Sequence, residues 1–323
     1  MNKLTKVVIA CAVSMSAIAA TGIQAATLKM SHALPTEHPV HKSLDWFAQE
    51  VRKDAKLRVK VYPNGTLGNE AEGLQMVQNG TVAFTKASAA TLNTFAADYM
   101  LLSLPYLYSD RDQYLKVLNG PIGQEILASS RDSGFIGLAF LDAGERSFYT
   151  SKPIKTPDDL KGMKIRVQNS AISIDTIKAL GGTPVPLPYG ELYSAMQQGV
   201  VDGAENNIPS YFSSRHYEVK KVFSRDMHTM VPDVLVISTK VWDTLSEEQQ
   251  QGIRSAAQKT IAVQEQNWNA YEQAAVGDLE QYGVEFVDSD IAKFQAAVKP
   301  VYDKFREQNP SLVPLLEQIQ STH

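Results

Sequence analysis

The chain has 323 residues, with 31 Lys and Arg against 35 Asp and Glu and therefore a formal net charge of −4. Its 44% hydrophobic and 20% charged residues are typical of a soluble globular protein with one large or two medium domains. A nucleic-acid-binding protein needs a basic face, which this balance argues against, so an acidic ligand has to be held by local positive charge.

The first 25 residues have the pattern of a secretory signal peptide. Lys3 and Lys6 precede the uncharged residues 7–20, and small residues follow. A membrane anchor is disfavoured because about 20 apolar residues are needed to span a bilayer. Cys11 is the only cysteine, so the mature chain has no disulfide or thiolate ligand; lipidation of Cys11 is the alternative.

From residue 27 onward, strand-like and helix-like segments alternate, which indicates an α/β architecture with largely parallel strands. The first series of predicted elements comprises a strand at 28–31, a helix at 39–52, a strand at 57–62, a helix at 69–79, a strand at 82–85, an apolar loop at 101–108, a helix at 112–129 and a strand at 135–140.

A second series follows, with a capped turn at 156–160, a strand at 164–167, helices at 170–180 and 189–198, and a strand at 234–238. The longest predicted helix covers 247–282 and begins with a capping box of Ser246 and Gln249. It would be about 55 Å long, enough to underlie two lobes, although Gly277 is a possible kink. A strand, a helix and a frayed end are expected after it.

We therefore expect a two-lobed α/β fold with crossing strands. The predicted division is a signal peptide at 1–25, a first lobe from 26–143 plus 232–271, and a second lobe from 144–231 plus 272–323.

The common enzyme motifs are missing from this sequence. It contains no GxSxG, HExxH, phosphate loop or GxGxxG after a strand. Its six histidines are scattered, and His38 and His41, the pair closest in sequence, have no third ligand beside them. We predict a non-catalytic binding protein without a metal or cofactor.

Two arginines are candidates for holding an acidic ligand. Arg146 follows the strand at 135–140, and Arg166 lies inside the strand at 164–167. A guanidinium in a buried strand needs a partner, and its planar fork matches a carboxylate. The competing interpretation is a salt bridge within the protein, to Glu205 or Asp202, and spacing does not separate the two.

Other polar side chains lie at the ends of predicted elements, where binding groups and ordinary caps both occur. The segment 202–209 is read as turn-rich and supplies two amides, while an aromatic set around 189–217 either lines a pocket or packs. These candidates are Asn206, Asn207, Tyr211, His38, Glu70 and Asp233.

Four segments together resemble one known family. They are Tyr-Pro-Asn-Gly-Thr-Leu-Gly at 62–68, Leu-Pro-Tyr at 104–106, Lys-Gly-Met-Lys-Ile-Arg-Val-Gln-Asn at 161–169 and Asp-Gly-Ala-Glu-Asn at 202–206. With the long helix they resemble the solute-binding proteins of tripartite ATP-independent periplasmic (TRAP) transporters, of the dicarboxylate type. The resemblance covers essentially the whole mature chain and implies a periplasmic protein that delivers an organic acid to membrane subunits.

The resemblance also assigns roles to residues. It implies that Arg166 grips the ligand carboxylate with help from Asn206, and that Arg146 matches an arginine of members that bind sugar acids or sialic acid. Ser88 and Thr91 stand where sialic-acid-binding members carry glutamate and arginine, which argues against sialic acid.

Further similarity to sugar-acid-binding members surrounds His38, Glu70, Asn207 and Tyr211. A hexuronate is therefore the expected ligand. A C4-dicarboxylate is the main alternative, because Arg146 can equally hold a second carboxylate. A third possibility is a secreted enzyme that acts on acidic sugars. Such an enzyme would need two carboxylates, one as the acid and one as the base. A fourth possibility is a ligand-sensing protein that acts as the partner of a membrane receptor.

Overall fold

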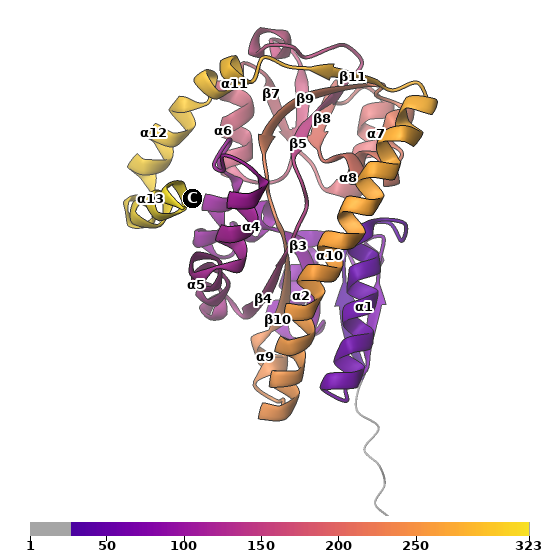
Figure 1. Cartoon of the computed structure of the whole chain (residues 1–323), viewed down its shortest axis with the longest axis vertical. Coiled ribbons are helices and arrows are strands. Elements are labelled where there is room, and N and C mark those ends of the chain that lie inside the picture. The colour runs from indigo at the N-terminus through magenta and orange to yellow at the C-terminus, as the bar shows by residue number, and fades with distance from the viewer. Residues whose placement is uncertain (1–26, 323) are drawn as a thin grey trace, which may run out of the picture.

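The computed structural model describes residues 27–322, so the predicted signal peptide lies outside the described residues. Two lobes, each built around a mixed sheet, are stacked along the long axis, and one long helix runs beside both of them (Figure 1). Among the described helices, none combines the length and the apolar character needed to cross a membrane.

The first lobe has a five-stranded sheet in the order β2-β1-β3-β10-β4. Strand β1 is parallel to β2 and β3, whereas β10 is antiparallel to β3 and β4. The bounds are β1 (Leu28–Ser31), β2 (Val59–Tyr62), β3 (Phe84–Ser88), β4 (Phe135–Leu141) and β10 (Asp233–Ser238).

The second lobe has a six-stranded sheet in the order β11-β9-β5-β8-β6-β7, in which β5 is antiparallel to β8 and β9 and the other pairs are parallel. Its strands are β5 (Arg146–Thr150), β6 (Lys164–Val167), β7 (Thr183–Pro186), β8 (Gly203–Asn206), β9 (Val222–Thr229) and β11 (Glu285–Asp288). The largely parallel arrangement that the sequence suggested is wrong at β5 and β10, because the chain crosses between the lobes directly before each of these strands.

Two further expectations are corrected here. The segment 202–209, read as turn-rich, contains β8. The predicted helix at 112–129 is two helices, α4 (Arg111–Asn119) and α5 (Pro121–Ser129), because Pro121 lacks an amide hydrogen and fits only the first turn of a new helix.

The remaining helices cover the two sheets. They are α1 (Pro39–Asp54), α2 (Glu70–Asn79), α3 (Ala89–Leu92), α6 (Ala171–Ala179), α7 (Leu192–Gln197), α8 (Ile208–Ser213), α9 (Thr239–Trp242), α11 (Ile291–Ala297), α12 (Lys299–Gln308) and α13 (Val313–Ser321), with a 3₁₀ helix over Ala97–Ser103.

Helix α10 (Glu247–Gln281) has the predicted capping box at Ser246 and Gln249 and continues without a break through Gly277. It packs on α1 and β4 in the first lobe and on α8 in the second. At the lobe crossing, Gly144 has φ +59°, and a Cβ there would lie 2.8 Å from Nε1 of the buried Trp268. A glycine is needed at this position for both reasons.

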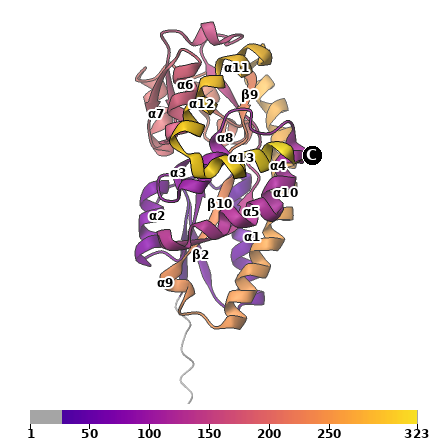
Figure 2. The same cartoon turned by 90° about the vertical axis from the view of Figure 1, so that its left-hand side faces the viewer.

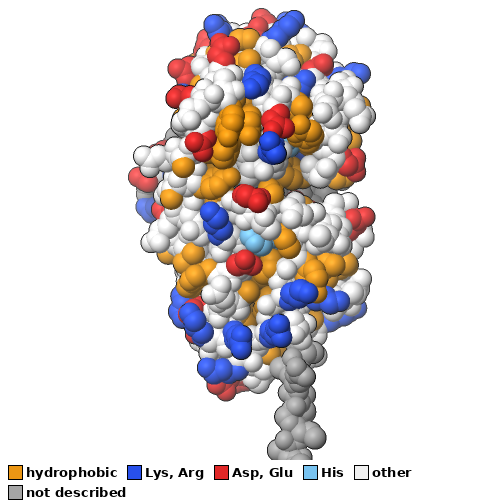
Figure 3. Space-filling view, turned by 90° about the vertical axis from the view of Figure 1, so that its right-hand side faces the viewer, with side chains coloured by type: hydrophobic (Ala, Val, Ile, Leu, Met, Phe, Trp, Pro, Cys, Tyr) orange, Lys and Arg blue, Asp and Glu red, His pale blue; other side chains and the backbone are white. Residues whose placement is uncertain are grey.

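On the face that carries α1 and α10, hydrophobic side chains gather over the second lobe and Lys and Arg side chains gather at the far end of the first (Figure 3). Contacts among Phe212, Tyr217, Tyr271 and Tyr282 join α8 to α10.

The C-terminal helix α13 lies beside α5 of the first lobe (Figure 2). Nε2 of Gln113 in α4 donates to the carbonyls of Ile319 and Thr322 at 3.1 and 2.7 Å. We propose that the chain divides between the lobes after residues 143, 231 and 271. Helix α13 belongs to the segment assigned to the second lobe, but it contacts α5 of the first lobe.

Candidate binding site

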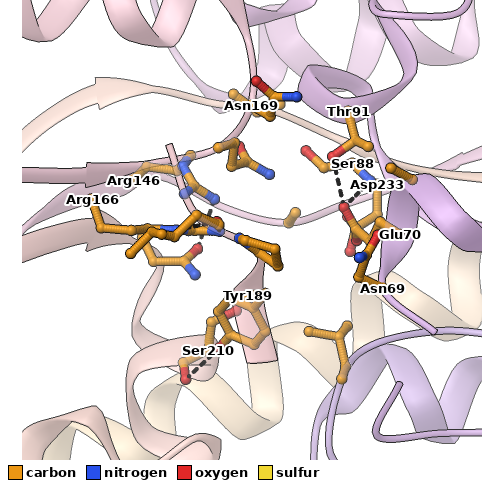
Figure 4. Close-up of a pocket in the computed structure, with 18 of the residues that line it drawn as sticks. Asn69, Glu70, Ser88, Thr91, Arg146, Arg166, Asn169, Tyr189, Ser210 and Asp233 are labelled. Carbon is orange, nitrogen blue, oxygen red and sulfur yellow. Dashed lines mark hydrogen bonds between the residues drawn. The ribbon is translucent and has the colours of Figure 1, made fainter. Parts of the chain in front are cut away.

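A cavity of about 330 Å³ lies between the two sheets and is lined from both lobes (Figure 4). Its polar lining residues are Asn69, Glu70, Lys86, Ser88, Thr91 and Asp233 from the first lobe and Arg146, Arg166, Gln168, Asn169, Tyr189, Asn206, Asn207 and Ser210 from the second.

Arg166 is a buried cation without a carboxylate partner among the described residues. Nε and Nη2 both donate to the carbonyl of Leu187, at 3.0 and 2.8 Å. The centre of the Tyr189 ring lies 5.8 Å from the guanidinium carbon of Arg166. Nη1 has no hydrogen-bond partner in the described part of the chain. Burial lowers the pKa of Arg166, but a guanidinium stays protonated in proteins. The competing interpretation, a salt bridge to Glu205 or Asp202, is therefore wrong for Arg166.

Arg146, in contrast, has the internal salt bridge. Nε and Nη2 donate to the two carboxylate oxygens of Glu205 at 2.6 and 2.9 Å, and Nη1 donates to Oδ1 of Asn206 at 2.7 Å. Burial would raise the pKa of Glu205, but Arg146 and His228 together outweigh burial and lower it to about 2. Arg146 therefore lines the cavity with its positive charge already balanced by Glu205.

A second charge pair lies behind this one. His228 is 3.5 Å from Glu205 through Nε2 and 2.8 Å from Asp226 through Nδ1. Burial would lower the pKa of His228, yet Asp226 and Glu205 together raise it to about 9. Four buried groups thus alternate in charge from Arg146 to Asp226, an arrangement that holds Arg146 and Glu205 in one geometry.

The opposite end of the cavity is built around Lys86, whose side chain is only 3% exposed. Its Nζ donates to Glu70 at 2.8 Å and to Asp233 at 2.9 Å. Burial would lower the pKa of Lys86, but Asp233 and Glu70 outweigh burial and raise it. One cation and two carboxylates give this cluster a formal charge of −1.

The two carboxylates of this cluster differ in their donors. Burial raises the pKa of both and Lys86 lowers it, but Glu70 also accepts from the Thr91 hydroxyl at 2.9 Å and the Ser88 amide at 3.3 Å, so the pKa of Glu70 is lowered overall. For Asp233, burial outweighs Lys86 and raises the pKa. The cluster therefore presents one firmly ionised carboxylate and one that protonates more readily.

Six of the eight predicted site residues line this cavity: Arg146, Arg166, Asn206, Asn207, Glu70 and Asp233. Among them, Asn207 also has the competing role of a cap, because its Oδ1 accepts from the Ser210 amide at the start of α8.

The structure does not bring Tyr211 or His38 to the cavity wall. Tyr211 packs on Tyr149 and Phe223 in the core of the second lobe, and its hydroxyl donates to the carbonyl of Lys220 at 2.6 Å. His38 lies one residue behind the wall, 3.1 Å from the Ser210 hydroxyl.

Sequence reasoning missed Lys86 as a site residue. A signal existed: a lysine within Phe-Thr-Lys-Ala-Ser at 84–88 is an ion in a strand of small and apolar residues, which requires buried counter-charges. Gln168 and Asn169 follow β6, and the sequence identified them only as part of a family motif. It identified Tyr189 only as one of a group of aromatic residues. Ser210 had no signal, since its place depends on how α8 meets the other lobe.

The described residues contain no group of three or more His, Cys, Asp or Glu placed to hold a metal ion.

The chain belongs to the family of bacterial extracellular solute-binding proteins, family 7, whose model matches residues 30–309. This membership confirms the predicted class, the resemblance to TRAP solute-binding proteins and the two-lobed fold. It also confirms the periplasmic location that the resemblance implied.

Similar structures and relatives have named ligands. A TRAP periplasmic solute-binding protein from Bradyrhizobium, solved with galacturonate, is 40% identical, covers 92% of this chain and 100% of its own, and has a TM-score of 0.89. Another from Anaerococcus prevotii, solved with glucuronate, is 36% identical, with 92% and 97% coverage and a TM-score of 0.89. The C4-dicarboxylate-binding periplasmic protein of Rhodobacter capsulatus is 28% identical over 87% of this chain and 86% of its own.

Proposed function

We propose that this protein binds a sugar acid, specifically a hexuronate, in the cavity between its lobes and delivers it to the membrane subunits of a TRAP transporter. The observation that carries the proposal is the charge difference between the ends of the cavity. Among the described residues, Arg166 has no carboxylate counter-ion at one end, whereas Lys86 has two at the other.

At the first end, a ligand carboxylate would supply the missing anion. Nη1 of Arg166 is buried without a partner in residues 27–322, and a charge-assisted hydrogen bond to a carboxylate is among the stronger hydrogen bonds. Asn206 and Arg146 line the same wall, and because four of the five N–H groups of Arg146 bind Glu205 and Asn206, it leaves one N–H for a ligand without adding net charge.

At the second end, the charge of −1 disfavours another carboxylate, because like charges in a desolvated site repel. Hydroxyl groups fit better, since each both donates and accepts. Glu70 and Asp233 offer acceptor oxygens, and Asn69 and Asn169 are amides in the same lining. This end therefore favours the hydroxylated ring of a uronate over the second carboxylate of a C4-dicarboxylate. The relatives solved with galacturonate and glucuronate support the same choice.

Thermal unfolding and calorimetry with D-galacturonate, D-glucuronate and succinate test the proposal. We expect both uronates to raise the Tm and succinate to have a much smaller effect, because a ligand at 100 times its Kd stabilises the folded state by about 2.7 kcal/mol. Tighter binding of succinate than of either uronate would contradict the ligand assignment and favour the dicarboxylate alternative.

Catalysis on acidic sugars is disfavoured by the placement of the carboxylates. A glycosidase needs an acid and a base on the two sides of the scissile bond. Here Glu70 and Asp233 both bind the same Lys86 Nζ, so they lie together on one side. Intact uronic acid oligomers after prolonged incubation with the protein are the expected result, and cleaved products would overturn it.

A further inference from the structure

One pair of side chains joins the two lobes beside the cavity. His38 precedes α1 of the first lobe, and Ser210 lies in α8 of the second. The His38 Nε2 and the Ser210 Oγ are 3.1 Å apart, and the two residues are 1% and 4% exposed. Ser210 lines the cavity, and His38 does not.

The tautomer of His38 follows from its second contact. Its Nδ1 accepts from the backbone amide of Val40 at 3.2 Å, as the cap of α1, so Nδ1 carries no hydrogen. Burial, followed by the charge of Lys86, holds the pKa of His38 well below its ordinary value, so the ring is neutral. The hydrogen is therefore on Nε2, and His38 is the donor to the Ser210 oxygen.

This direction fixes what Ser210 has left to offer. Its oxygen accepts from His38, and its own hydrogen has no acceptor recorded in the described part of the chain. The Ser210 carbonyl accepts from the Tyr189 hydroxyl at 3.2 Å, and Tyr189 lies over Arg166. Ser210 thus stands on the wall that carries Arg166, with a hydroxyl hydrogen available to an oxygen in the cavity.

We propose that His38 is a positioning residue of the closed binding site: it does not touch the ligand, but it orients the Ser210 hydroxyl as a donor to the ligand and ties that donor to the opposite lobe. The inference rests on the proposed function, because it needs an oxygen-rich ligand in this cavity. It also replaces the direct ligand contact that the sequence suggested for His38.

The substitution His38→Asn isolates this role. Asparagine is as good a helix N-cap as any residue, so α1 keeps its cap, but the shorter amide does not reach across to Ser210. We expect the Kd to weaken about tenfold, as for the loss of one buried hydrogen bond. Wild-type affinity in this variant would overturn the proposal.

A double-mutant cycle with Ser210→Ala provides the readout that a structural role would not change. Once Ser210 is alanine, His38→Asn is expected to weaken binding no further, because the donor that His38 orients is gone. If the two losses instead multiply as independent effects, His38 does not act through Ser210.

Asn93 and Ser170 offer a matched control. The Asn93 amide donates to the Ser170 hydroxyl at 3.0 Å, which also joins the two lobes, and neither residue lines the cavity. We expect Asn93→Ala and Ser210→Ala to act independently on the Kd. Coupling of the same size in this pair would show that any contact between the lobes suffices, and would contradict a specific role for His38.

The probe is whichever of D-galacturonate, D-glucuronate and succinate raises the wild-type Tm most. If succinate is that compound, the proposed function fails, yet the cycle is still measured with succinate and decides the role of His38. If a uronate is that compound and the cycle shows no coupling, the inference fails while the proposed function stands.

Discussion

Arg166 and Lys86 are both buried cations in a wall of the same cavity, and they differ in where their counter-charges come from. Lys86 has Glu70 and Asp233 from its own lobe, whereas Arg166 has only a backbone carbonyl and a tyrosine ring among the described residues. Breaking a buried ion pair leaves an uncompensated charge, so Lys86 and its carboxylates depend on one another, whereas we propose that a ligand supplies the anion for Arg166. The first end of the cavity is therefore prepared for an anion, and the second is complete without one.

Removing Arg166 tests the unpaired end and has the largest expected effect. Arg166→Ala should weaken uronate binding by about 3–5 kcal/mol, more than a hundredfold in Kd, because the ligand carboxylate would be buried without its cation. Calorimetry measures this loss. Arg166→Lys keeps the charge without the planar fork and should fall between the two proteins.

The same substitution should spare the fold. Since Nη1 of Arg166 lacks a partner in the part of the chain that the structure describes, Arg166→Ala is expected to leave the Tm of the ligand-free protein unchanged or higher. A marked fall in this Tm would show that Arg166 is a structural residue and would weaken the contrast with Lys86.

Removing Lys86 tests the paired end, and here the loss should appear in stability. Lys86→Met leaves Glu70 and Asp233 buried without their shared cation, at a cost of about 3 kcal/mol and several degrees in Tm. Part of the loss is relieved because the raised pKa of Asp233 lets it take up a proton. Adding Glu70→Gln and Asp233→Asn should restore much of the Tm, which thermal unfolding measures; no recovery would contradict the charge explanation.

The stability of the folded protein should depend on pH, because His228 lies behind Arg146 and Glu205 and is charged in the folded state. Its folded pKa is about 9 against an ordinary 6.5, so its contribution is complete below about pH 6.5 and is lost as the pH rises through 9. The wild-type Tm should therefore fall over this range, and His228→Gln should flatten the profile. His216 is a matched control, because burial lowers its pKa to about 3 and it stays neutral throughout; His216→Gln should keep the slope.

The smallest expected effect concerns the choice between ligands. Glu70→Gln removes one negative charge from the Lys86 cluster, so succinate should gain roughly tenfold relative to D-galacturonate. Competition calorimetry measures this ratio. Glu72→Gln is the control on the same helix, since Glu72 belongs to the capping box of α2, does not line the cavity, and glutamine also serves in such a box. An equal change in both variants would contradict the role of the second end.

Much of the first end was accessible from sequence. Arg166 was singled out because a guanidinium inside a four-residue strand has to be buried, and β6 has the predicted bounds. The long helix was equally predictable, since its capping box and its length are local properties. The class of protein followed from the order of four motifs.

The second end was only half predictable. Glu70 and Asp233 were named, but the lysine that joins them was not, because Glu70 lies 16 positions before Lys86 and Asp233 lies 147 after it. Which arginine is neutralised was likewise undecided, because Arg146 meets Glu205 only through the antiparallel pairing of β5 with β8. That pairing exists because the chain crosses between the lobes before β5.

The sequence by itself determined the α/β class, the long helix, the family and the candidate cations, because these depend on local pattern and on motifs that are contiguous in the chain. Only the tertiary structure decided which cation has no counter-charge among the described residues, that Tyr211 belongs to the core, and that His38 lies behind Ser210. The physical reason is that net charge and hydrogen-bond partners in a buried site are set by side chains from distant segments, and no single segment contains that sum.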